Sequence, residues 1–136
     1  MAVFNKFDCF VENVAEKVHN LGSDQLTLAL TNSAPSAGNT VLANITEITY
    51  TNLSTRNLTT SSSSQTSGLY KLVVADTTLT STGGSTGPFR YVVVYNSTAA
   101  GGPLIGWYDY ASALTLNSGE SLTVDFDQVN GLLTIQ

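Results

Sequence analysis

The N-terminal segment has hydrophobic residues at helical spacing. Phe10 and a set of six apolar residues lie on one side of a helical projection, because their spacing alternates between three and four: Phe4, Phe7, Val11, Val14, Val18 and Leu21. Gly22 supplies a stop. The pattern predicts one amphipathic α-helix from Val3 to Leu21, within an N-terminal unit of residues 1–22.

The apolar side of this helix has alternative roles. It either covers the core of the chain's own domain or contacts a neighbouring subunit, and a short coiled-coil seam has the same spacing. Fewer than three heptads are present, so the pattern leaves these alternatives open.

After Gly22 the hydrophobic period changes to two, which is the period of a strand. Leucines alternate with threonine and alanine over residues 26–31, and this predicts a half-buried strand. Residues 69–75 and 90–96 are rich in β-branched and aromatic residues and are predicted to be core strands. The Ser/Thr-rich residues 58–67 are predicted to form an exposed edge strand and a turn.

The C-terminal part continues this alternation. Leu122, Val124 and Phe126 are predicted to face inward, and Asn130-Gly131 is a hairpin signal. Further strands are predicted over residues 103–110, 114–116, 121–126 and 132–135.

These elements indicate a mainly β fold. About eight short strands separated by turn signals, without a βαβ rhythm, favour an antiparallel β-sandwich that is jelly-roll-like. Residues 41–50 fit either a helical turn or the start of a strand. A length of 136 residues fits a single domain, with the N-terminal helix in residues 1–22 and the sandwich in residues 23–136.

The composition is poor in charge and limits the partners. Charged residues make up 11% of the chain, its formal net charge is −5, and its five basic residues are scattered. Nucleic-acid affinity depends on phosphate neutralisation, so no direct nucleic-acid partner is expected. No segment approaches the roughly 20 apolar residues that cross a bilayer, so no membrane partner is expected and the protein is predicted to be made in the cytoplasm.

Residues that carry chemistry are scarce. His19 is the single histidine and is predicted to satisfy helix-end carbonyls or to lie in solvent. Cys9 is the single cysteine, so it forms no intrachain disulfide and is predicted to be a small packing residue. One Cys and one His do not complete a zinc site. We therefore expect no catalytic residues, metal or cofactor.

Three aspartates allow weaker interpretations. Asp125 and Asp127 share a face of a predicted strand, and Asp109 would add oxygen ligands for Ca²⁺. The same carboxylates would serve a hydrolase of cell-wall sugars. We favour the ordinary role of such acids, which is to keep a strand face solvated and to block edge-to-edge pairing.

Aromatic residues concentrate in two predicted strands. Trp107 is expected to face inward and Tyr108 and Tyr110 to face the other way, either as phenols at a binding surface or packed under loops. With the apolar side of the helix they define a candidate interaction surface: Phe4, Phe7, Val11, Val14, Val18, Tyr108 and Tyr110.

The chain resembles a set of small virion proteins of tailed bacteriophages. The resemblance spans nearly the whole chain, and these segments carry it: AEKVHNLGSD, LTLALTNSAPSAGNTVLANITEI, QTSGLYKLVVAD, GPFRYVVVYN, PLIGWYDY, TVDF and NGLLTI. Within this set, the size and predicted jelly-roll character are most similar to capsid decoration (cement) proteins. The resemblance brings no catalytic residues with it.

The resemblance implies a non-enzymatic structural function. It predicts a protein on the capsid exterior of the virion that binds major capsid protein, bridges its subunits and stabilises the shell, as a homo-oligomer (dimer or trimer). The alternative is a tail or fibre-associated protein that recognises a host glycan through Tyr108 and Tyr110.

Overall fold

The fold is mainly β. The computed structural model describes residues 2–136, over which it has nine strands, one α-helix and one 3₁₀ turn. In chain order these are β1 (Phe4–Lys6), α1 (Cys9–Ala15), β2 (Leu26–Thr31), η1 (Leu42–Asn44), β3 (Thr60–Thr66), β4 (Leu69–Val74), β5 (Thr77–Thr80), β6 (Thr86–Asn96), β7 (Leu104–Leu116), β8 (Ser121–Val124) and β9 (Leu133–Ile135).

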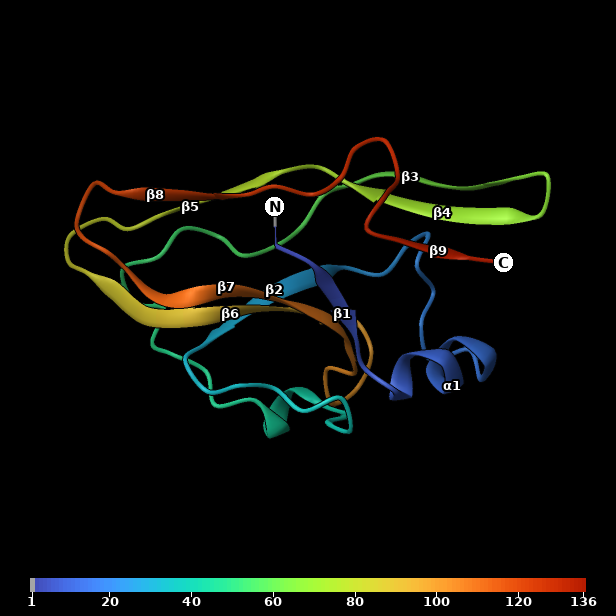
Figure 1. Cartoon of the computed structure of the whole chain (residues 1–136), viewed down its shortest axis with the longest axis horizontal. Helices are drawn as coiled ribbons and strands as arrows, with labels where there is room; N and C mark the ends of the chain where they lie inside the picture. The colour runs from blue at the N-terminus through green and yellow to red at the C-terminus, as the bar shows by residue number, and fades with distance from the viewer. Residues whose placement is uncertain (1) are drawn as a thin grey trace.

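The strands form three antiparallel sheets. Their strand orders are β1-β7-β6-β2, β3-β4-β9 and β5-β8. Figure 1 shows two layers, one made by the four-stranded sheet and the other by the two smaller sheets. α1 lies at the same end of the molecule as β4 and β9 (Figure 1). The prediction of a mainly β, antiparallel fold with one helix near the N-terminus is confirmed.

The main core lies between the two layers. It joins apolar side chains of β2, β6 and β7 to side chains of the opposite layer, among them Leu72 and Val74 of β4, Leu79 of β5 and Val124 of β8. These four side chains are fully buried, so water is excluded between the layers. Burial of this kind is the dominant favourable term in folding.

A second buried cluster covers the other face of the four-stranded sheet. Its buried members are Phe7, Ala29, Ile45, Val93, Tyr95 and Leu104. β2 and β6 therefore have neighbours on both faces, and all six residues of β2 are buried. The prediction that β2 is half-buried is wrong. Its polar residues are satisfied inside, since the Thr27 hydroxyl lies 3.1 Å from Asn57 Oδ1 and 2.8 Å from Ser97 Oγ.

The prediction of one helix from Val3 to Leu21 is wrong at both ends. Phe4–Lys6 form β1, which pairs with β7, and the α-helix covers only Cys9–Ala15. Between them Phe7 is fully buried against Trp107, at 4.5 Å between ring centroids. Pairing with β7 and burial of Phe7 outweigh the local helical preference, because most helical stability comes from tertiary packing.

α1 ends in a Schellman motif. The Lys17 N–H donates to Val14 O at 3.3 Å and the Val18 N–H donates to Asn13 O at 2.8 Å. Lys17 occupies the left-handed position of this motif with φ 66°, where glycine is the usual residue. This turn redirects the chain, so Val18 and Leu21 lie outside the helix.

Most of the remaining strands were predicted. β2, β4, β8 and β9 fall within the predicted segments, and β3 is an edge strand as expected. β6 includes the predicted residues 90–96 but begins earlier, at Thr86. The predicted strands 103–110 and 114–116 join in one strand, β7, which continues through Ala111 at φ 69°. Residues 41–50 contain a 3₁₀ turn, Leu42–Asn44.

The predicted hairpin at Asn130-Gly131 does not form. β8 pairs with β5, whereas β9 pairs with β4. The Asp127 carboxylate accepts the backbone N–H groups of Val129 and Asn130 at 2.9 and 2.7 Å, which closes a local turn. The turn therefore connects β8 to β9 without pairing them, and the two strands belong to different sheets.

β1 and β7 approach each other closely at Gly106. The register places Lys6 opposite Gly106, and a Cβ added there would lie 2.6 Å from Asn5 O and 2.6 Å from Phe4 Cε2. Only a residue without a side chain fits beneath β1 at this position.

Candidate interaction surface

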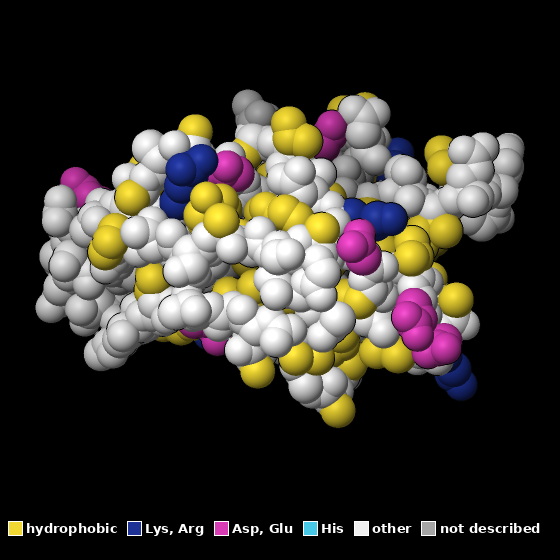
Figure 2. All heavy atoms as spheres, turned by 60° about the horizontal axis from the view of Figure 1, so that its bottom comes forward, with side chains coloured by type: hydrophobic (Ala, Val, Ile, Leu, Met, Phe, Trp, Pro, Cys, Tyr) yellow, Lys and Arg dark blue, Asp and Glu magenta, His cyan; other side chains and the backbone are white. Residues whose placement is uncertain are grey.

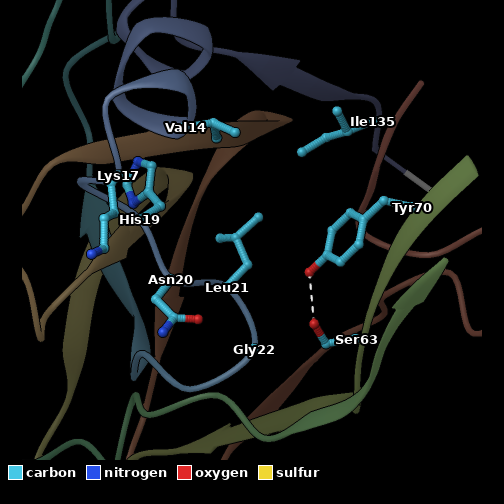
Figure 3. A pocket seen from close by; sticks show the side chains of 9 residues that line it. All are labelled: Val14, Lys17, His19, Asn20, Leu21, Gly22, Ser63, Tyr70 and Ile135. Atoms are coloured by element: carbon cyan, nitrogen blue, oxygen red, sulfur yellow. Dashed lines mark hydrogen bonds between the residues drawn. The ribbon is translucent and has the colours of Figure 1, made fainter.

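An open groove separates the N-terminal segment from the β3-β4-β9 sheet. Its volume is about 540 Å³, and it is lined by Val14, Lys17, His19, Asn20, Leu21, Gly22, Ser63, Tyr70 and Ile135. Figure 3 shows Lys17 and His19 on the side opposite Tyr70 and Ile135. The lining is mostly apolar, and Lys17 is its one permanently charged member. The groove is larger and more apolar than the hollow beside it, which residues 22–25 and 58–60 line.

The sheet side of the groove is fixed by a side-chain hydrogen bond. The Tyr70 and Ser63 hydroxyls lie 2.8 Å apart, across the β3–β4 pair (Figure 3). Tyr70 and Ile135 are cross-strand neighbours in β4 and β9, so their side chains share a face. An apolar ring and an aliphatic side chain thus face the groove in a defined geometry.

The opposite side is anchored through the buried His19. The Asn96 amide nitrogen of β6 lies 3.1 Å from His19 Nδ1 and 2.6 Å from Asp24 Oδ2. The Asn96 amide oxygen accepts the N–H groups of Thr98 and Ala99 at 3.0 and 3.1 Å. This fixes the amide orientation, so Nδ1 of His19 accepts and the ring proton lies on Nε2.

The predicted place of His19 is wrong. It lies beyond the helix, is 7% exposed, and packs on Phe10 at 5.5 Å between ring centroids. In the part of the chain that the structure describes, its Nε2 has no hydrogen-bond partner. Burial lowers the pKa of His19, and the nearby Asp24 carboxylate partly opposes this shift. Its role in the structure is to tie the groove wall to β6.

The candidate surface predicted from the sequence divides in two. Val11 and Val18 are exposed, Val14 lines the groove, and Phe4 is half-buried. Phe7 is fully buried in the second core cluster and offers no surface. Of the exposed members, Val11 lies in α1, and Val18 lies in the turn after it between the groove residues Lys17 and His19.

The predicted orientation of the aromatic residues in β7 is reversed. Tyr108 belongs to the main core, is 5% exposed, and packs on Phe4 and Phe126. Trp107 packs on Phe7 at the opposite face and is half-buried. Tyr110 is half-buried, and burial raises its pKa. The register with β1 explains this orientation, because Phe4 lies directly opposite Tyr108 and covers it.

The three aspartates act separately. Asp109 pairs with Arg90, with Oδ1–Nε at 2.7 Å and Oδ2–Nη2 at 3.0 Å, and this hydrogen bonding lowers the pKa of Asp109. Hydrogen bonds from Asn130 lower the pKa of Asp127. Among residues 2–136 no group of three or more acidic, His or Cys side chains is placed to hold a metal ion. The idea of a shared Ca²⁺ site on Asp109, Asp125 and Asp127 therefore finds no support.

Cys9 faces backbone. Its Sγ lies 3.6 Å from Leu104 O, and burial raises the pKa of the thiol. A raised thiol pKa lowers the fraction of reactive thiolate. Cys9, the first residue of α1, thus packs against the start of β7.

The outer surface carries few charges. Figure 2 shows a face on which uncharged polar and hydrophobic side chains predominate and charged ones are scattered. Over residues 2–136 no helix has the length and apolar character needed to span a membrane.

The sequence does not predict the groove. Leu21, Tyr70 and Ile135 come from three distant segments, and none differs in type from an ordinary core residue. The apolar spacing around Val14 and Val18 indicated the wall formed by the N-terminal segment. Nothing in the sequence indicated the wall formed by the β3-β4-β9 sheet.

Comparison with known proteins gives no match. No protein-family model matches it, and no curated protein or solved structure is significantly similar to it.

Proposed function

We propose that this protein is a non-enzymatic structural component of a tailed-phage virion that binds the outside of the capsid. In this proposal it bridges subunits of the major capsid protein, acts as a homo-oligomer, and has the jelly-roll-like character of decoration proteins. The resemblance of the segments between residues 15 and 135 is one support for it.

The observation that carries the proposal is the uncovered apolar groove. Val14, Leu21, Tyr70 and Ile135 face a space of about 540 Å³, and exposed Val18 adjoins it. Apolar surface that stays uncovered in the isolated chain is typical of a protein-binding site. Lys17 is the one permanently charged residue in the lining, so little desolvation cost opposes docking in the groove itself.

Stabilisation of a shell follows from mass action. A protein that binds only the assembled, expanded shell lowers its free energy relative to the opened state by an amount that grows with occupancy. A copy that contacts more than one capsid subunit gains from effective concentration, so modest contacts suffice. This function needs a rigid body and an adhesive surface, and it needs no reactive group.

The test is the reconstitution of expanded capsids that lack this protein. Cryo-electron microscopy is expected to show saturable and symmetric occupancy on the shell. Ile135→Glu places a carboxylate in the groove and is expected to lower binding by at least about tenfold, because the charge loses its hydration on docking. Thr134→Glu adds the same charge at the neighbouring exposed position, on the other face of β9, and is expected to bind as the wild type does.

Two results contradict the proposal. Density for this protein only in the tail removes the capsid location, and unchanged capsid binding by Ile135→Glu removes the groove as the docking surface. The glycan-binding alternative has weaker support, because the Tyr108 ring on which it relies lies in the main core.

A further inference from the structure

β3 presents an uncharged and unpaired strand edge. Its seven residues, TSSSSQT, contain no charge and no proline, and β3 is the outer strand of the β3-β4-β9 sheet. Outside the ladder with β4, the backbone of residues 60–66 makes no hydrogen bond to any other described part of the chain. Natural proteins usually protect such an edge with charges, proline or a covering loop.

The other sheet edges are protected. β2 is covered by residues 47–58, through bridges from Thr27 to Asn57 and from Thr31 to Glu47. β1 and β9 have three residues each, and β1 ends at Lys6. At the end of β5, the Ser54 N–H donates to Thr80 O at 2.9 Å and Leu53 bridges Ser81, the next residue. β8 is flanked by acids at positions 120 and 125. Only β3 combines length, neutrality and an open edge among the described strands.

The register with β4 defines which backbone groups are free. Thr66 and Leu69 flank a two-residue turn and are the first hydrogen-bonded pair, so Ser64 and Lys71 are the next. The N–H and C=O groups of Ser63 and Gln65 therefore point away from β4. The pairing is irregular between Thr60 and Ser62, which leaves residues 62–66 as the regular part of the edge.

We infer that a second copy of this chain pairs with β3 edge to edge, about a two-fold axis at Ser64. Ser63 and Gln65 of one copy exchange hydrogen bonds with Gln65 and Ser63 of the other, and Ser64 faces its equivalent across the axis. An antiparallel pair of identical strands is self-complementary, and the neutral side chains avoid like-charge repulsion. The β3–β4 hairpin extends beyond the end of the four-stranded sheet (Figure 1).

Hydroxyl side chains suit this contact. Elsewhere in the chain, opposed strands already use such pairs, with Thr78–Thr123 and Thr80–Ser121 hydroxyls 3.0 and 2.7 Å apart. The contact is short, since about four backbone hydrogen bonds cross the axis, so we expect a weak dimer in solution. The association uses the isolated chain only and does not depend on the capsid proposal.

The test compares two charge substitutions on opposite sides of Lys71. Ser64 and Thr134 are both direct cross-strand neighbours of Lys71, one in β3 and one in β9. Ser64→Glu and Thr134→Glu thus gain the same ion-pair partner within the fold. Sedimentation equilibrium is expected to show a wild-type dimer with a dissociation constant below about 1 mM. The dissociation constant is expected to be about tenfold higher for Ser64→Glu and unchanged for Thr134→Glu.

A cross-link tests the register directly. Two cysteines at a non-hydrogen-bonded pair lie within disulfide reach, so Ser64→Cys is expected to give a covalent dimer with oxidised glutathione and Thr134→Cys is not. A wild-type protein that stays monomeric at about 1 mM overturns the inference, and so does equal weakening by the two Glu variants. Failure here leaves capsid binding by the groove intact, because that binding is measured with Ile135→Glu.

Discussion

Gly106 lies where β7 passes beneath β1, and Gly106→Ala tests whether this close approach holds the N-terminal segment in place. An added Cβ meets the Phe4 ring and lies 2.6 Å from Asn5 O. The ring can rotate away, whereas the carbonyl belongs to the paired backbone of β1. The backbone contact therefore forces β1 to move as a unit.

The magnitude follows from what β1 holds. Inserting one methyl into a packed site costs about 1–3 kcal/mol when the surroundings adjust. If β1 separates from β7, Phe7 follows it out of the second core cluster, and the loss of a buried Phe is worth about 3–5 kcal/mol. We expect the free energy of unfolding to fall by about 2–3 kcal/mol. This value lies between the cost of a local adjustment around the added methyl and the cost of separating β1 from β7.

Trp107 reports the event. It is the single tryptophan, it lies opposite Asn5 in the β1–β7 register, and its ring contacts Phe7. Movement of β1 hydrates the indole, so Gly106→Ala is expected to shift the native emission to longer wavelength. Urea unfolding followed at the same wavelength gives the loss in free energy.

The control is Gly38→Ala. An added Cβ at Gly38 has nothing within 4 Å, and Gly38 is not among the positive-φ glycines, so its effect is expected to stay within about 0.5 kcal/mol. A Gly106→Ala protein with unchanged emission and a loss below about 0.5 kcal/mol would falsify the idea that β1 depends on this contact.

Three further substitutions test the turns and the buried histidine. Lys17→Gly is expected to stabilise the protein by about 0.5–1 kcal/mol in urea unfolding, because glycine adopts the left-handed turn without steric cost. Ser67→Asn is expected to raise the free energy of unfolding by about 0.5 kcal/mol, since Ser67 and Gly68 both have positive φ, at 52° and 83°, and Asn-Gly is favoured in such turns. Since the pKa of His19 is lowered in the fold, its neutral form supports stability fully above about pH 6.5, and that support is lost as the pH falls toward the folded pKa. The wild type is therefore expected to lose more stability between pH 7 and pH 5 than His19→Asn, whose amide oxygen accepts from Asn96 at every pH.

Each of these has a distinct contrary result. Lys17→Ala removes the same charge without relieving the turn, so equal stabilisation by Ala and Gly would show that charge and not backbone is responsible. A Ser67→Asn protein less stable than the wild type contradicts the turn assignment. Parallel pH curves for the wild type and His19→Asn show that His19 does not titrate differently in the fold.

The sequence predicts strands correctly where the hydrophobic pattern of a segment is regular. The apolar runs over 69–75 and 90–96 predicted β4 and most of β6, because a buried strand is recognisable from a continuous run of β-branched and aromatic residues. β2 was located correctly but its burial was not, since the segment that covers Thr27 and Thr31 is a loop without periodicity. Local pattern locates a strand and does not show how many faces are covered.

The N-terminal segment shows the opposite limit. Its 3/4 spacing is compatible with one helix, yet a strand, a turn and a short helix satisfy the same apolar positions. Which of these forms depends on β7, whose partner residues lie about a hundred positions later in the chain. The groove was unpredictable for the same reason, because Leu21, Tyr70 and Ile135 meet only after the sheets assemble.

Double coverage of β6 has a consequence for how the protein opens. β6 pairs with β7 on one side and β2 on the other, and both of its faces are packed. Fraying of an edge or a loop leaves the central amides of β6 untouched, so their deuterium uptake requires the whole molecule to unfold. The slowest-exchanging amides, in Val92–Val94, therefore give the global free energy of unfolding without any denaturant.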